Sequence, residues 1–284
     1  VCSSDLDIDP DTQCVTARTV EQALTDRTRA VLPVLYGGRA VDLTSLTDTF
    51  AERGIAVLED AAHAFGSHQS KQLVGATGVL TCFSFGPIKS LTCIEGGAIV
   101  PRTAEDAHQA RRLRTLGIGQ SQADRIRTTS YTVHSAGLRA TMSAVHAAVG
   151  LIQLMRFPPT ATARQDLWRA YATGLTDVPG AALVDVDIER SVPFNCVVRV
   201  TDRDRVFTTL RDLGIGVGVH YPPNHLQPAF RPWHRPLPAT EASAGQILSL
   251  PFHLGLTADD VHHVTAVLDK VLHACAPSRQ DRTR

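Results

Sequence analysis

Short apolar runs alternate with helix-like segments through the first half of the chain, and this alternation restricts the possible folds more than any other feature. Residues 29–35 and 55–58 are two such runs, each expected to form a buried strand. Between them, residues 42–53 carry apolar side chains at helical spacing, and two further strands are expected at 79–85 and 97–100. Strands that alternate with helices are typical of a layered α/β domain with a largely parallel sheet.

The second half has a different composition, and the change comes at the Pro158-Pro159 pair, directly after an apolar helix expected at residues 144–154. We therefore expect residues 1–157 to form a large domain and residues 158–276 a smaller α+β domain. The polar residues 277–284 are expected to be a disordered tail. Elements expected in the smaller domain are helices at 160–174 and 203–213, strands at 194–200 and 215–219, and a last helix capped by Thr257.

Charge and hydropathy exclude several classes of protein. The 28 basic residues balance the 28 acidic ones, so no overall field favours nucleic acid or an anionic membrane surface as a partner. The longest apolar run, residues 147–155, is too short to cross a bilayer, and the first residues do not resemble a secretion signal. We expect a cytoplasmic protein, whose six scattered cysteines are reduced and lack metal-like spacing.

Two residues are candidates for chemistry. Asp60 ends a predicted strand, where α/β sheets bind ligands, although for this residue alone capping of the next helix is the favoured explanation. Lys89 follows a strand and a Gly86-Pro87 turn, with no other charged residue before Glu95. A single lysine is usually a solvated surface residue, but a desolvated lysine has a lowered pKa and attacks aldehydes. Together, such a pair suits pyridoxal 5′-phosphate, which needs a Schiff-base lysine and an aspartate at its pyridine nitrogen.

The residues around this pair resemble the DegT/DnrJ/EryC1/StrS aminotransferases, in segments spread over nearly the whole chain. The matching segments lie at residues 7–12, 35–38, 58–64, 82–89, 95–98, 142–143, 147–154, 220–222 and 248–251. The resemblance implies a three-layer α/β/α transferase fold of the aspartate-aminotransferase type that acts as a homodimer with pyridoxal phosphate. It also implies amination of a keto-sugar carried on a nucleotide, usually with glutamate as donor, for a surface polysaccharide or a secondary metabolite.

Carried over position by position, the resemblance implies a role for each matching residue. Lys89 would hold the cofactor covalently and then act as the general base, and Asp60 would pair with the pyridine nitrogen. His63 would lie beside the ring oxygen of the cofactor, and Ser84 would contact its phosphate. A related group of sugar dehydratases has histidine in place of the lysine, so the lysine here favours transamination.

Three further positions match less simply. His220 and Tyr221 match a motif near the substrate mouth, for which core packing is an equally good explanation. Arg139 stands where the family has an asparagine that reaches the cofactor phosphate of the neighbouring subunit, and its guanidinium is expected to bind that phosphate instead. Thr141 replaces a family arginine, and together these departures leave full activity open.

The family begins well before Asp7, with a glycine-led phosphate-binding turn and a residue that stacks on the pyridine ring. Residues 1–6 do not resemble the strand expected at that place. We therefore expect an N-terminally truncated chain that binds the cofactor poorly. The alternative function is a catalytically inactive relative, or a fragment with a regulatory or structural role.

The 12 histidines prompt a third hypothesis, a metal-dependent hydrolase. His262 and His263 are adjacent, so on a helix they face different directions, and His220 and His225 have no neighbouring carboxylates in the sequence. We therefore expect no metal site.

Overall fold

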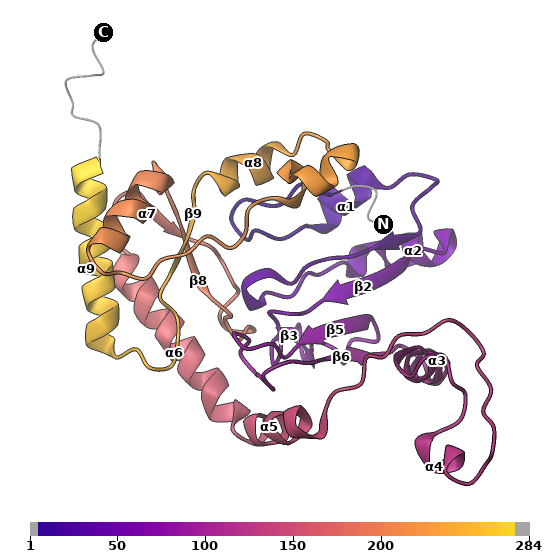
Figure 1. Ribbon diagram of the computed structural model, residues 1–284. Coiled ribbons are helices and arrows are strands. Elements are labelled where there is room, and N and C mark those ends of the chain that lie inside the picture. Colours follow the sequence, from indigo (N-terminus) through magenta and orange to yellow (C-terminus); the bar gives the residue numbers. More distant parts are fainter. Residues whose placement is uncertain (1–4, 276–284) are drawn as a thin grey trace.

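The computed structural model describes residues 5–275, so the expectations for residues 1–4 and for the tail 277–284 fall outside the described residues. A four-stranded sheet organises the first half (Figure 1). In their spatial order the strands are β1 (Ala30–Val31), β2 (Ala56–Asp60), β5 (Leu80–Ser84) and β6 (Gly97–Val100). Strands β1, β5 and β6 lie within the predicted apolar runs, and β2 extends two residues beyond the run predicted at 55–58.

The sheet is mixed rather than largely parallel. The pairs β1–β2 and β2–β5 are parallel, as expected, but β6 runs antiparallel to β5. The chain returns from β5 to β6 through a loop that contains no helix, and an antiparallel neighbour needs no helical crossover. The loop begins at Phe85, whose N–H donates to the carbonyl of Gly96 at 2.8 Å. The loop that carries Lys89 is therefore closed at its base by a continuation of the β5–β6 pairing.

Helices surround this sheet, and local sequence explains where several of them begin and end. A threonine followed three residues later by an acid predicts a helix cap at Thr103, and its side chain does accept a hydrogen bond from the Asp106 N–H. Gly54 ends another helix in the left-handed conformation, with φ of 61°. The helical elements of this half are α1 (Ala17–Ala23), η1 (Tyr36–Gly38), η2 (Thr44–Leu46), α2 (Thr47–Arg53), α3 (Ala104–Arg114) and α4 (Gln122–Arg125). A small hairpin of β3 (His68–Gln69) and β4 (Gln72–Leu73) was not predicted.

The second half has its own antiparallel sheet of three strands, β7 (Ala181–Leu183), β8 (Cys196–Val200) and β9 (Ile247–Leu250). Strand β8 confirms a prediction, whereas β7 and β9 were not predicted. The strand expected at residues 215–219 is wrong, because only Gly218 pairs there, in an isolated bridge to Ser249.

Helices cover this second sheet, with α6 and α9 side by side (Figure 1). The helical elements are α6 (Phe157–Leu175), α7 (Arg203–Asp212), η3 (Asn224–Leu226), η4 (Pro228–Trp233), α8 (Pro238–Ala244) and α9 (Ala258–Cys275). The Asp260 N–H donates to the Thr257 hydroxyl, so Thr257 caps the last helix as predicted. No helix within residues 5–275 is long and apolar enough to cross a membrane.

Two large hydrophobic cores, and a small third cluster of Leu91, Phe157 and Val192, hold the chain together. The core of the second half lies between its sheet and the helices, around Tyr171, Val198 and Leu268. The core of the first half includes Leu35 and Phe50, but also side chains from β8 and β9 and from the loop before β8. The boundary expected at residue 157 is not tested by this arrangement, so it stays a prediction.

In the segment from α3 to α5 (Ala144–Met155), α3, α4 and the loop after them extend away from the rest of the molecule, whereas α5 lies at the end of α6 (Figure 1). Its helix α5 was predicted from its apolar sequence, yet none of the 12 residues in this helix is buried. Large apolar side chains on α5 that remain exposed are Val145, Leu151, Ile152, Leu154 and Met155. Such a continuous exposed apolar face is typical of an interface.

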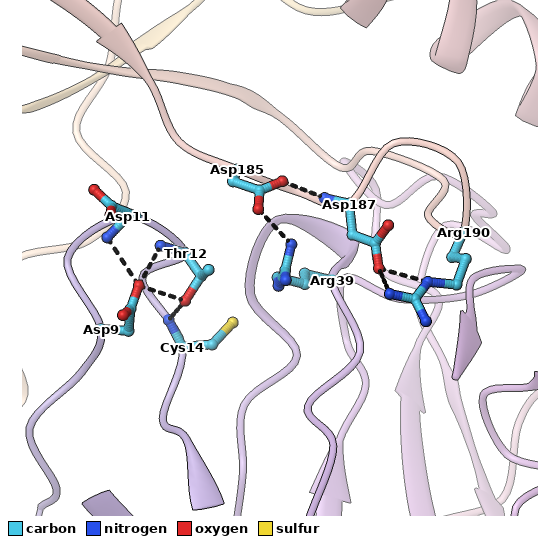
Figure 2. Close-up of polar contacts among 8 residues, drawn as sticks. All are labelled: Asp9, Asp11, Thr12, Cys14, Arg39, Asp185, Asp187 and Arg190. Carbon is cyan, nitrogen blue, oxygen red and sulfur yellow. Dashed lines mark hydrogen bonds and ion pairs between the residues drawn. The ribbon is translucent and has the colours of Figure 1, made fainter. Parts of the chain in front are cut away.

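Polar contacts join residues of the first half of the chain to residues of the second half. Asp7 accepts hydrogen bonds from the backbone N–H groups of Ala239 and Thr240, at 3.0 and 2.8 Å, and so caps α8 from a distant part of the chain. Arg39 forms an ion pair with Asp185 at 2.9 Å. Figure 2 shows this second contact, together with the Arg190–Asp187 ion pair and the turn around Asp9. Arg39, Asp187 and Arg190 are among the residues that line a polar cavity of about 190 Å³.

Candidate active site

Asp60 lies at the carboxyl end of β2, where the register places it opposite Cys82 of β5. Its Oδ1 accepts a hydrogen bond from the Ala62 N–H at 3.0 Å, so it also stabilises the turn that follows. A pocket of about 290 Å³ opens at this edge of the sheet. Residues that line the pocket include Leu32, Asp60, Ala62, Cys82, Phe83 and Ser84. Asp60 therefore borders a ligand-sized space, in the place where α/β sheets bind ligands.

The neighbouring carboxylate of Glu59 has a different environment. Glu59 is buried and accepts a hydrogen bond from the Thr81 hydroxyl at 2.8 Å. Burial raises its pKa, against a lowering effect of the hydrogen bond from Thr81. Both acids of the Glu59-Asp60 pair thus border the pocket, but among the described residues only Glu59 has a side-chain hydrogen-bond partner on the neighbouring strand.

Lys89 is half-buried in the loop between β5 and β6, in a turn in which its N–H donates to the carbonyl of Gly86 at 3.2 Å. Its Nζ lies 4.7 Å from the ring centroid of Phe194, at cation–π distance. Burial lowers the pKa of Lys89, and the negative charge of Asp60 offsets part of this effect. Lys89 and Asp60 are therefore near enough to interact, and the amine is more easily deprotonated than that of an exposed lysine.

His63 lies on the same aromatic side chain. Its imidazole stacks on Phe194 with 3.9 Å between the ring centroids, and the residue is buried, with an exposed fraction of 7%. Burial lowers the pKa of His63 to about 3, with further lowering from the positive charges of Lys89 and His220. Its Nδ1 is buried without a hydrogen-bond partner among the described residues. A neutral imidazole with one unsatisfied nitrogen is thus held beside the amine.

His220 and Tyr221 have different surroundings, although they are adjacent. His220 Nδ1 makes a 2.8 Å hydrogen bond with the Ser249 hydroxyl of β9, and its backbone carbonyl accepts from the Tyr36 hydroxyl. Tyr221 is half-exposed, and its hydroxyl lies 3.5 Å from His63 Nε2. The structure therefore brings the Tyr221 hydroxyl beside His63 and ties the His220 side chain to the second sheet.

Ser84 and Arg139, the other two predicted residues, lie in different places. Ser84 ends β5, lines the same pocket as Asp60, and accepts a hydrogen bond from the Gly86 N–H at 3.4 Å. Arg139 is exposed and pairs through its backbone with Thr115, directly after α3. In this chain Arg139 is therefore part of the segment that stands out from the molecule, apart from the group formed by Asp60, His63 and Lys89.

Sequence reasoning did not identify Phe194 or Tyr36 as part of this site. Tyr36 belongs to one of the matching segments, and its ring centroid lies 5.9 Å from that of His63. Its pKa is raised by burial, while the nearby Asn195 amide lowers it. Phe194 lies 105 residues after Lys89, and nothing in its local sequence indicates a contact with that lysine.

The site combines an amine of lowered pKa, a nearby carboxylate and a pocket at the end of a sheet. An amine of this kind reacts with aldehydes, and a carboxylate at the pocket edge binds a protonated ring nitrogen. Among residues 5–275, no three histidine, cysteine or acidic side chains are grouped so that they could hold a metal ion. The arrangement thus suits covalent attachment of a carbonyl compound.

Comparisons with known proteins agree with this chemistry. The model of the DegT/DnrJ/EryC1/StrS aminotransferase family matches residues 5–269. The aminotransferase TlmJ from Streptoalloteichus hindustanus is 30% identical with a TM-score of 0.87, over 96% of this chain and 74% of that chain. The sugar aminotransferase CalS13 from Micromonospora echinospora is 26% identical with a TM-score of 0.86, over 93% of this chain and 73% of that chain. DesI, solved in the presence of its TDP-sugar product, is 30% identical with a TM-score of 0.85, over 98% of this chain and 71% of that chain. These similarities confirm the expected α/β transferase fold class.

Proposed function

The chain belongs to the DegT/DnrJ/EryC1/StrS aminotransferase family, and from this we propose that it transfers an amino group, usually from glutamate, to a keto-sugar carried on a nucleotide. Pyridoxal 5′-phosphate is the cofactor of this proposal. The observation that carries the proposal is the electrostatic pairing of a desolvated Lys89 amine with Asp60 at the edge of a pocket.

The residues present suit this cofactor. Lys89 would form the covalent bond to its aldehyde, and the Asp60 carboxylate would hold the proton of its pyridine nitrogen. The unsatisfied Nδ1 of the buried His63 would gain a partner in a polar group of the ring, which removes the cost of leaving it unpaired. Ser84 lines the same pocket and offers a hydroxyl to the phosphate. When bound, the cofactor supplies an electron sink that makes a proton on the neighbouring substrate carbon acidic.

The proton transfer falls to Lys89. Burial lowers the pKa of the amine, so a larger fraction is neutral at physiological pH than for an exposed lysine. A neutral Nζ would accept the proton from the substrate carbon and then deliver it to a carbon of the cofactor, as a general base of suitable pKa does. The Asp60 charge limits how far the pKa falls, which keeps the amine basic enough for this role.

The nucleotide-linked sugar is proposed from the relatives, since DesI was solved in the presence of its TDP-sugar product and CalS13 is a sugar aminotransferase. Tyr221 lies at the mouth of the site with a half-exposed ring and hydroxyl, where it can contact such a substrate. The setting we propose is the cytoplasm, and the product is an amino sugar for a surface polysaccharide or a secondary metabolite.

The proposed active form is a homodimer, supported by the exposed apolar side chains of α5. Helix α5 packs closely against the loop that carries Lys89, because a Cβ at Gly150 would lie only 3.0 Å from the Cβ of Cys93 in that loop. In a dimer formed through α5, the exposed Arg139 would reach the cofactor phosphate of the partner subunit. This combination explains why Arg139 lies apart from the other predicted residues in a single chain.

The proposal is tested by the absorbance spectrum of the purified protein with added pyridoxal phosphate, before and after borohydride. We expect a protein-bound absorbance band that borohydride converts to a stable adduct, found by peptide mass spectrometry on Lys89. Lys71→Ala, which removes an exposed lysine, should leave the band unchanged, whereas Lys89→Ala should abolish it. Absence of the adduct from the parent protein, or its presence on Lys71 or Lys270, would contradict the proposal and favour an inactive relative.

A further inference from the structure

Arg164 of α6 is a buried arginine with an unusual set of partners. Its exposed fraction is 8%, and its guanidinium donates to two backbone carbonyls, from Nε to Pro193 at 2.7 Å and from Nη2 to Phe194. The guanidinium also lies 4.9 Å from the ring centroid of Phe252. Within residues 5–275, none of the ion pairs of the structure involves Arg164.

A charge buried in this way is costly to the folded state. Desolvation lowers the pKa of Arg164 to about 10, so the guanidinium remains protonated at neutral pH. Burial of a charge without an opposite charge costs several kcal/mol unless hydrogen bonds compensate. Here two backbone carbonyl groups compensate by accepting hydrogen bonds from the guanidinium. If an apolar side chain replaced Arg164, both carbonyls would lose these donors. The location of those carbonyls therefore indicates what the arginine stabilises.

The carbonyls belong to the short segment that leads into β8, and this segment carries Phe194. The Phe194 N–H donates to the carbonyl of Gly37 at 2.9 Å, while its own carbonyl accepts from Arg164. The backbone of Phe194 is thus held from both sides. Its ring then meets the two groups already described, the Nζ of Lys89 at 4.7 Å and the stacked imidazole of His63 at 3.9 Å.

We propose that Arg164 is a positioning residue for Lys89, which acts by fixing the backbone of Phe194 so that the phenyl ring stays against the lysine amine. The relevance of this to catalysis rests on the proposed function, but the contact itself is a property of the chain. With the ring in place, water is kept from one side of the amine. Without the two hydrogen bonds from Arg164, the segment can shift, and water reaches the amine.

The test measures the pKa of the Lys89 amine in the cofactor-free full chain, from the pH dependence of acetylation by acetic anhydride, followed by peptide mass spectrometry. The chain has only three lysines, so Lys71 and Lys270 serve as references within the same sample. In Arg164→Met we expect the pKa of Lys89 to rise by about half a unit or more, because loss of burial raises a lysine pKa. Both reference lysines should keep the pKa that they have in the parent.

A double-mutant cycle tests whether Arg164 acts through Phe194. Phe194→Ala should raise the pKa of Lys89 by itself, because the water admitted to the amine outweighs the lost cation–π contact, and Arg164→Met added to it should give no further rise. Additive shifts, or an unchanged pKa of Lys89 in a folded Arg164→Met protein, would overturn the proposal. Arg164→Lys can reach one of the two carbonyls, so it should give a smaller shift, and it serves if the methionine variant does not fold.

Tyr171→Phe is the matched control, since Tyr171 lies on the same helix and also donates to a backbone carbonyl, that of Pro251 at 2.7 Å. Its loss should lower stability without a change in the pKa of Lys89. An equal pKa shift in Tyr171→Phe would mean that general loosening of α6, not Phe194, causes the effect. The acetylation experiment needs no cofactor, so the two proposals can be separated. If the parent gives no borohydride adduct but the Lys89 pKa shifts as expected in the variants, the proposed function is refuted and the positioning role of Arg164 stands.

Discussion

The imidazole of His63 and the phenyl ring of Phe194 are stacked, with centroids 3.9 Å apart and planes 16° from parallel. The stack joins a residue just beyond β2 in the first half of the chain to the segment before β8 in the second half. Because Lys89 lies against the same phenyl ring, this contact places a neutral imidazole beside the amine. The titration of His63 is therefore linked to the stability of the fold and to the site.

His63→Gln should make the protein more resistant to acid. The folded pKa of His63 is lowered to about 3 from an ordinary 6.5, so the unfolded chain binds a proton at this residue that the folded chain does not. Stability is therefore full above pH 6.5 and is lost as the pH falls toward 3, by about 3 kcal/mol at pH 4. Glutamine carries no such proton, so the loss between pH 7 and pH 4, measured by urea unfolding, should be smaller by that amount. Equal losses in the two proteins would contradict the assignment of a buried neutral His63.

Asp60→Asn should lower the pKa of the Lys89 amine further. The negative charge of Asp60 favours protonated Lys89 and opposes the effect of burial, so its removal leaves burial alone. The pH dependence of lysine acetylation in the cofactor-free chain measures this shift. Asp48→Asn, which changes an exposed carboxylate on α2, should leave the Lys89 titration unchanged. A rise in the pKa of Lys89 in Asp60→Asn would show that the two groups do not interact as described.

Asp7→Ala should destabilise the protein by about 1–2 kcal/mol, the usual cost of losing a helix cap. Asp7 accepts from the N–H groups of Ala239 and Thr240 and from the Thr240 hydroxyl. Asp7→Asn keeps one acceptor oxygen and should lose less. Hydrogen exchange at Ala239 and Thr240 should rise in the alanine variant, and unchanged protection at these amides would contradict the capping role.

The double variant Leu151→Glu and Met155→Glu should weaken self-association of the chain by at least about a hundredfold. Both side chains are exposed on α5, one turn apart, and each loses about 1.5–3 kcal/mol of burial if the face is an interface. Sedimentation equilibrium measures the change. Gln109→Glu adds the same charge to α3, which has no buried residues, and should leave association unchanged. A parent chain that is monomeric at all concentrations would refute the proposed homodimer.

Sequence reasoning located the elements whose signals are local. Three predicted features depend only on neighbours a few residues away, and the structure confirms each of them. They are the helix caps at Thr103 and Thr257 and the strand that ends at Asp60. Strand β9 was missed because its four residues are all buried and show no alternation. At residues 215–219 the alternating apolar residues Ile215 and Val217 are buried, as a strand would require. The segment nevertheless forms no strand, because only Gly218 pairs with β9.

The same limit applies to the candidate site. Asp60 and Lys89 were predicted because Asp60 ends a strand and Lys89 follows one, each within a recognisable motif. Phe194 and Arg164 have no such local signal, because an aromatic residue before a strand and an arginine on an amphipathic helix are both common. Their contacts with the site depend on how the second half packs against the first, which short-range patterns do not encode.

The Asp7 cap also bears on the order in which the protein is made. The carboxylate of Asp7 and the N–H of Ala239 are separated by 232 residues along the chain. At roughly 5–20 residues per second, a ribosome needs about 10–50 s to synthesise that interval. During this time the beginning of the chain has left the ribosome while its partner does not yet exist. The Asp7 carboxylate therefore acquires its backbone partners only after residue 240 has been synthesised, so this contact forms late in the folding of the chain.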